Sequence, residues 1–220
     1  MPSKARIIFL NGISSSGKSS LAHALQQILE EPYPHANADA VKEMSAGIPP
    51  AEWGTAFERG AFMPRLYAAI PACFATLASF GNHLIIDDVV RPLQLRNYVE
   101  ALSAYEVWFV GVHCSLEELE RRETERGNRR LGTARRQMEQ GLVHTPGIYD
   151  LEVDTSLHTP ETCALQIKQR LQTGIAPDAF QRLAQIPVET LWYLTDGIDQ
   201  SIYAAAHPEK YDDCDGAADR

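Results

Sequence analysis

The stretch that decides the fold is Gly12-Ile13-Ser14-Ser15-Ser16-Gly17-Lys18-Ser19, which we call the P-loop. It matches the pattern G-x-x-x-x-G-K-[ST] at every fixed position. Before it, residues 5–11 (ARIIFLN) form a short apolar run with β-branched residues at its centre, which predicts a buried strand. After it, apolar residues recur at helical spacing over residues 18–30. A strand, a loop and a helix in this order are the setting in which such a loop binds phosphate.

The P-loop predicts a site for the phosphates of a nucleotide. Its glycines allow backbone angles that turn amide groups toward phosphate oxygens, and the next helix directs its positive end to the same place. In this motif Lys18 reaches the β- and γ-phosphates, and the hydroxyl of Ser19 coordinates Mg²⁺. We therefore expect ATP and Mg²⁺ here. The expected nucleotide-binding residues are Gly12, Ser14, Ser15, Ser16, Gly17, Lys18, Ser19 and Ser20.

Strands and helices alternate along the rest of the chain. Apolar runs predict strands at residues 83–90, 106–114 and 150–155, with a short extended piece at 35–38. Helical spacing predicts helices at residues 55–80, 92–103, 115–126, 134–142 and 159–171. Pro64 and Pro71 should kink or split the first of these helices. The alternation predicts an α/β fold: a mostly parallel sheet with helices on both faces, and ligands at the carboxyl ends of its strands.

Three carboxylates follow strands at that edge of the predicted sheet. Asp87 and Asp88 end the run LIIDD, and either could hold Mg²⁺ with Ser19, because alternation alone does not say which one faces the P-loop. Asp39 follows the short extended piece, where it could accept the proton of a substrate hydroxyl during phosphoryl transfer. It could equally be the N-cap of a helix that begins at Ala40.

Arginines are concentrated in residues 121–136, which hold seven of the fifteen in the chain. Two glycines within this segment predict a loop that could close over a triphosphate, neutralise its charge and exclude water. We expect Arg126 at the nucleotide and three others, Arg129, Arg130 and Arg135, at the transferring phosphoryl group. Arg121 and Arg122 have glutamates at neighbouring helical turns, so surface ion pairs explain them equally well.

Length, charge and cysteine content exclude several other classes. The chain has 220 residues and a net charge of −9, which excludes a general nucleic-acid-binding surface but not a nucleotide site. Its four cysteines form no C-x-x-C pair, so we expect reduced thiols in a cytoplasmic protein rather than disulfides or zinc. The seven histidines form no ligand cluster. The sequence contains no run of 18 consecutive apolar residues, so we expect no membrane span.

A C-terminal extension is expected to begin at residue 174, where prolines separate short amphipathic stretches before an acidic end. We expect one domain over residues 1–173 and a helical extension over residues 174–220. The extension could pack on the domain, cover an acceptor site or contact a second copy of the chain. The sequence does not decide between these alternatives.

Together these segments resemble the chloramphenicol phosphotransferase family of P-loop kinases. The resemblance rests on Asp39 and on IIFLNGISSSGKSS (7–20), LIIDDV (84–89), VWFVGVHC (107–114), RRETERGNR (121–129) and YDLEVDTS (149–156). It implies a P-loop NTPase fold with a five-stranded parallel sheet, like that of small-molecule and nucleoside-monophosphate kinases. It also implies ATP-dependent phosphorylation of a hydroxyl on a small molecule, with Asp39 as general base.

The identity of the acceptor stays open at this point. The chain departs from the family pattern at His113, at Asn128 and at Asn37-Ala38, so chloramphenicol or a related antibiotic is one candidate. The few cations between Asp39 and His83 count against an anionic acceptor, and a minority of the apolar residues there could line an acceptor pocket. A nucleoside-monophosphate or metabolite kinase of the same fold is the nearest alternative. A nucleotide-binding regulator that transfers no phosphate is the alternative from a different class.

Overall fold

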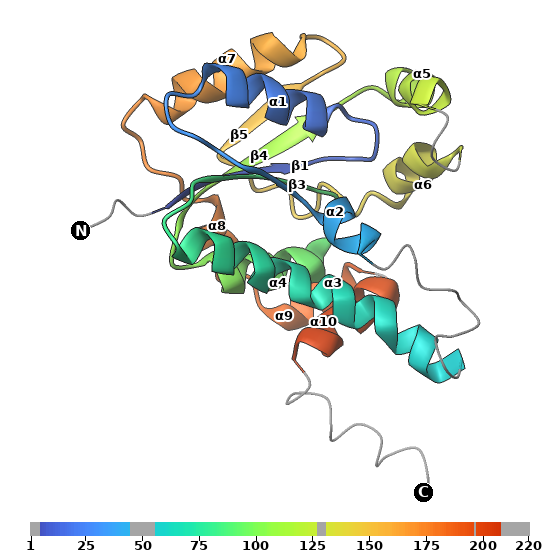
Figure 1. Cartoon of the computed structure of the whole chain (residues 1–220). Coiled ribbons are helices and arrows are strands. Elements are labelled where there is room, and N and C mark those ends of the chain that lie inside the picture. The colour runs from blue at the N-terminus through green and yellow to red at the C-terminus, as the bar shows by residue number, and fades with distance from the viewer. Residues whose placement is uncertain (1–4, 45–55, 127–130, 196, 208–220) are drawn as a thin grey trace, which may run out of the picture.

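A five-stranded sheet forms the centre of the protein in the computed structural model, which describes residues 5–44, 56–126, 131–195 and 197–207 (Figure 1). The strand order is β2-β3-β1-β4-β5, and every neighbouring pair is parallel. The strands are β1 (Arg6–Asn11), β2 (His35–Asn37), β3 (Leu84–Asp88), β4 (Glu106–His113) and β5 (Leu151–Asp154). The predicted α/β architecture with five parallel strands is confirmed.

Helices cover both faces of the sheet, as the apolar character of its strands requires. Helices α1 (Lys18–Ile28) and α7 (Pro160–Leu171) lie on one face, and α3 (Ala56–Ser79), α4 (Pro92–Leu102) and α8 (Ala179–Ala184) lie on the other (Figure 1). The remaining helices are α2 (Ala38–Glu43), α5 (Leu116–Arg126), α6 (Thr133–Gln140), α9 (Val188–Tyr193) and α10 (Gly197–Ala206). In the part of the chain that the structure describes, no helix combines the length and apolar character needed to cross a bilayer.

Strand β1 shows why the sequence forms this core. Its side chains alternate between the two faces. Ile7 and Phe9 pack under α3, α4 and α8, whereas Ile8 and Leu10 pack under α1 and α7. All four side chains are fully buried. A central strand that is buried on both sides reads as a continuous apolar run, which is the pattern seen before the P-loop.

The long helix α3 differs from one expectation. Pro64 and Pro71 both lie inside it, and the helix continues through them, so of the two expected outcomes, a kink or a split, the split is wrong. Each proline removes one backbone hydrogen bond. Packing of α3 against α4 and α10 compensates, because most helical stability in proteins comes from tertiary contacts.

The extension packs on the body of the protein. Phe180 of α8 lies against Phe109, with 5.4 Å between the ring centroids, and contributes to the same core as Phe9. The carboxylate of Asp150, just before β5, accepts hydrogen bonds from the backbone N–H groups of Asp178 (2.7 Å) and Ala179 (3.0 Å). These contacts dock the start of α8 beneath the sheet. The described residues of α8 therefore pack on the domain.

A buried tyrosine joins α4 to the end of β3. Tyr98 is fully buried, and its hydroxyl donates a 2.8 Å hydrogen bond to Oδ2 of Asp88. Oδ1 of Asp88 accepts the backbone N–H of Val89 at 2.8 Å. Burial, together with the Asp88 carboxylate, raises the pKa of the Tyr98 hydroxyl well above its ordinary value. The hydroxyl therefore stays protonated and remains a donor.

We expect Tyr98→Phe to lower the free energy of unfolding by about 2 kcal/mol, because it removes a hydrogen bond to a buried charged group. Urea denaturation followed by circular dichroism measures this loss. Tyr193→Phe is the matched control, since Tyr193 is 87% exposed. It should stay within about 0.5 kcal/mol of the wild type. Equal stability of the two variants would contradict the role assigned to Tyr98.

Candidate active site

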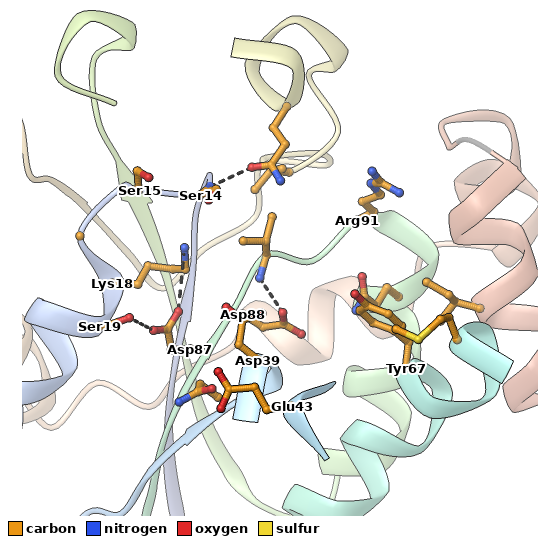
Figure 2. A pocket seen from close by; sticks show the side chains of 18 of the residues that line it. Ser14, Ser15, Lys18, Ser19, Asp39, Glu43, Tyr67, Asp87, Asp88 and Arg91 are labelled. Carbon is orange, nitrogen blue, oxygen red and sulfur yellow. Dashed lines mark hydrogen bonds and ion pairs between the residues drawn. The ribbon is translucent and has the colours of Figure 1, made fainter. Parts of the chain in front are cut away.

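A cavity of about 510 Å³ opens at the carboxyl ends of the strands, beside the P-loop (Figure 2). The P-loop and the end of β3 form one side of it, and α2, α3 and α10 form the other. The predicted edge of the sheet therefore holds the cavity, as expected for a parallel α/β sheet.

The P-loop adopts a conformation that depends on its glycines. Gly17, directly before α1, has a φ of 87°, in the left-handed region that favours glycine. At Gly12 an added Cβ would lie 2.4 Å from the carbonyl oxygen of Val112, so no larger residue fits. The hydroxyls of Ser15 and Ser16 are buried and have no hydrogen-bond partner in the structure. Ser15 also lines the cavity, so its buried, unpartnered hydroxyl at a helix N-terminus fits a phosphate group.

Lys18 and Ser19 meet the carboxylate of Asp87 (Figure 2). Oγ of Ser19 donates a 2.7 Å hydrogen bond to Oδ2 of Asp87. The ammonium of Lys18 lies 3.9 Å from Oδ1 of Asp87 and donates to the carbonyl oxygens of Gly12 (2.8 Å) and Ile13 (3.1 Å). A hydroxyl and a carboxylate in contact are the hard oxygen ligands that Mg²⁺ prefers, so the residues present fit this ion.

Electrostatics keep Asp87 ionised. Burial by itself raises the pKa of this carboxyl, but His35 at 3.4 Å, Lys18 and the hydroxyl of Ser19 outweigh it and leave the pKa below its ordinary value. Asp88 faces the other way, toward Tyr98, because adjacent side chains of a strand point to opposite sides. The structure thus brings Asp87, rather than Asp88, to Ser19.

Helix α2 places two carboxylates on the opposite side of the cavity. Asp39 and Glu43 lie one helical turn apart, and both line it. Oδ1 of Asn37 accepts the backbone N–H of Ala40 at 2.7 Å, so Asn37 caps this helix. The alternative in which Asp39 is the N-cap is therefore wrong. Asp39 lies in the first turn of α2, and Glu43 was not identified from the sequence.

Apolar side chains and one further cation complete this side. Met63, Pro64 and Tyr67 of α3 line the cavity, and Ile202 of α10 adds to the same wall. Arg91, at the start of α4, also lines it and was missed by the sequence analysis. Its position three residues after the LIIDD run was the available signal.

The arginine segment only partly meets expectation. Arg126, at the end of α5, lines the cavity. Arg129 and Arg130 lie outside the described residues. The structure does not bring Arg135 to the cavity: its Nε donates to Oε1 of Glu120 at 2.8 Å. Arg121 forms surface ion pairs with Glu118 and Glu125, as one of its two interpretations predicted.

The orientation of α6 explains the position of Arg135. The buried carboxylate of Glu123 accepts the backbone N–H groups of Gly132, Thr133 and Ala134 (2.7–3.2 Å), which fixes the start of α6. Gln137 then faces the P-loop, and its Oε1 accepts the backbone N–H of Ser14 at 2.8 Å. Arg135 lies two residues away, about 200° around the helix, and so faces away from the P-loop.

Some predicted nucleotide-binding residues do not line the cavity. Gly12 and Ser16 are buried within the P-loop, and Ser20 is exposed on α1. Arg122 supports the P-loop from behind, because its guanidinium donates to the hydroxyl (3.0 Å) and carbonyl (2.8 Å) of Thr155. The Thr155 hydroxyl in turn donates to the carbonyl oxygen of Ser16 at 2.7 Å.

A polar cluster lies at the ends of β4 and β5. The rings of His113 and His144 stack with their centroids 4.2 Å apart, and Nδ1 of His144 is 2.8 Å from the hydroxyl of Tyr149. Burial, then His113 and Lys18, lower the pKa of His144 to about 4, so its ring is neutral near pH 7.

Across the described residues, no group of three or more His, Cys, Asp or Glu side chains is arranged to hold a metal ion. An ion at Ser19 and Asp87 would therefore complete its coordination with water or with oxygens of a bound molecule.

Comparisons with known proteins identify the family of this chain. A sequence model of the chloramphenicol phosphotransferase-like protein family matches residues 5–172. A curated relative from Mycobacterium tuberculosis strain H37Rv, named "Putative O-phosphotransferase Rv2636", is 31% identical over 205 residues, which cover 82% of this chain and 88% of the relative.

Solved structures share the fold at low sequence identity. The tunicamycin resistance protein of Deinococcus radiodurans has a TM-score of 0.57 at 17% identity, and the match covers 79% of this chain and 99% of that one. The APS kinase CysC of Mycobacterium tuberculosis, solved with AMPPNP and APS, has a TM-score of 0.54 at 18% identity, with coverages of 78% and 100%. The sequence match, the P-loop and this fold lead to one conclusion: the chain belongs to the chloramphenicol phosphotransferase-like family and is a kinase of the P-loop type.

Proposed function

We propose that this protein transfers the γ-phosphoryl group of Mg²⁺-bound ATP to a hydroxyl of a small, uncharged molecule. The observation that carries the proposal is the composition of one cavity. Lys18 and the pair Ser19 and Asp87 line its phosphate side, and the carboxylate of Asp39 lines its acceptor side. Phosphoryl transfer between two bound molecules requires both functions within one enclosed space.

On the phosphate side, the residues position and neutralise charge. Mg²⁺, when bound, supplies the positive charge that offsets the β- and γ-phosphates. Ser19 and Asp87 would hold it through their oxygen atoms. Lys18 stabilises negative charge on the transferring group, and Arg126 adds a cation from the end of α5.

On the acceptor side, Asp39 takes the proton from the hydroxyl as its oxygen attacks phosphorus. A carboxylate suits this role because it can accept the proton while the new P–O bond forms and release it to water afterwards. The exposed position of Asp39 in the first turn of α2 keeps it within reach of a bound molecule. Two of the other carboxylates of the cavity, Asp87 and Asp88, contact Ser19 and Tyr98, and Glu43 lies one turn further along α2.

The negative charge on the acceptor side of the cavity supports an uncharged acceptor. Among the described residues that line this side, Asp39 and Glu43 are acidic and Arg91 is the one cation. A nucleoside monophosphate would bring a dianion close to these carboxylates, which costs free energy at short range. Neutral hydroxyl compounds avoid this repulsion. Chloramphenicol and related antibiotics are candidates of this kind.

The variant Asp39→Asn tests the base. We expect it to lower kcat for transfer from labelled ATP by about 10²–10⁴-fold. The affinity for a fluorescent ATP analogue should stay within about twofold, because Asp39 lies on the acceptor side. The acceptors are chloramphenicol and a panel of neutral hydroxyl compounds. Asp178→Asn, the same change at an exposed position outside the cavity, should leave both quantities unchanged. If Asp39→Asn transferred phosphate at the wild-type rate, Asp39 would not be the general base.

The pair Asp87 and Asp88 allows a matched test of the metal site. Asp87→Asn should raise the Mg²⁺ concentration needed for half-maximal binding of the fluorescent nucleotide by at least about tenfold, because it removes a charged oxygen ligand beside Ser19. Asp88→Asn, the same change one residue away, should shift this concentration by less than about threefold. Circular dichroism checks that both variants fold. Equal shifts for the two variants would show that Mg²⁺ is not held at Asp87.

A further inference from the structure

One wall of the cavity comes from outside the segment that the family model matches. That match ends at residue 172, whereas Ile202 lies on α10, in the extension. Its side chain is 5% exposed and lines the same cavity as Met63 and Tyr67 of α3. The extension therefore contributes surface to the acceptor side of the cavity.

The position of Ile202 is held by its neighbours. Tyr203, the next residue, is fully buried in a cluster with Leu93 and Leu191. At the end of α10, Nε2 of His207 lies 3.2 Å from a carboxylate oxygen of Glu100 on α4. Helix α10 packs against both α3 and α4, and the three helices lie together in Figure 1. Ile202 thus belongs to a packed wall, and a bound molecule has to fit against it.

The chemistry of the cavity indicates what Ile202 contacts. Its apolar neighbours Met63, Pro64 and Tyr67 form one wall, and the carboxylates of Asp39 and Glu43 line another part of the same acceptor side. A molecule with a hydroxyl near Asp39 has to place its body against an apolar surface to be held firmly. A branched side chain such as isoleucine also limits the size and shape of what fits.

We infer that Ile202 is a specificity-determining residue of the acceptor site, so that the extension, and not only the P-loop kinase core, selects the hydroxyl compound. This inference rests on the proposed function. It assigns the phosphate chemistry to residues 5–172 and part of the acceptor choice to α10. Two proteins of the family could then share the phosphate site and phosphorylate different molecules.

The first experiment compares Ile202→Ala with Ile186→Ala. Both remove the same atoms from the extension, but Ile186 is only partly buried and lies outside the cavity. Transfer from labelled ATP is measured for chloramphenicol and a panel of neutral hydroxyl compounds graded by size. Ile202→Ala should raise KM for the best acceptor by about tenfold and shift the preference toward bulkier compounds. KM for ATP should stay within about twofold for both variants.

The matched control separates specificity from stability. If Ile186→Ala changes the acceptor preference as much as Ile202→Ala does, or if neither changes it, the inference is wrong. Ile202→Val removes one methyl group and should give an intermediate shift in preference while disturbing the core least. Circular dichroism confirms folding, and the Val variant keeps the comparison valid if the Ala variant does not fold.

A binding measurement keeps the inference separate from the proposed function. If the wild type phosphorylates no compound, the proposed function fails, and the role of Ile202 is judged by NMR of isoleucine methyl groups. Titration with the same panel should shift the Ile202 methyl signal and leave that of Ile186 in place. The assignment of the two signals comes from the two alanine variants. No shift of the Ile202 signal with any panel compound would overturn the inference.

Discussion

Two adjacent buried carboxylates at the end of β3 are the constraint on which the rest of the structure depends. Asp87 and Asp88 are 7% and 5% exposed, and ionised groups removed from water need partners. Because neighbouring residues of a strand point to opposite sides, the two find partners on different elements. Asp87 meets Ser19 and Lys18 of the P-loop, and Asp88 meets Tyr98 of α4. One dipeptide thereby connects the phosphate site to the helical layer behind it.

The same arrangement divides the cavity by function. The P-loop and Asp87 form a side suited to phosphate and a divalent cation, and the buried, unpartnered hydroxyl of Ser15 lies on this side. Helices α2, α3 and α10 form a side with two carboxylates on α2 and several apolar side chains. The phosphate side comes from the segment that defines the family. The acceptor side draws on α2 and α3, which lie within the same matched segment, and on α10 of the extension.

Elements of the fold could be predicted from the sequence where a short local pattern has a direct physical cause. The P-loop, the central strands and most helices followed from glycine positions and from apolar periodicity. The position of a side chain could not be predicted where it depended on a contact made in the folded structure. Asn37 rather than Asp39 caps α2, and Glu120 holds Arg135 away from the P-loop. Arg91 and Gln137 also line the cavity; the one local signal for Arg91 was its position just after β3, and Gln137 had none.

The sequence by itself predicted the α/β fold, the P-loop and the family, because each follows from short segments whose pattern has a local physical cause: glycine positions in the P-loop and apolar periodicity in the strands and helices. The tertiary structure decided which of Asp87 and Asp88 faces Ser19, since that depends on how β3 pairs with β1. It also decided which side chains share the acceptor side. Asp39 and Ile202 are far apart in the chain, and only the packing of α10 against α3 and α4 brings both to one cavity.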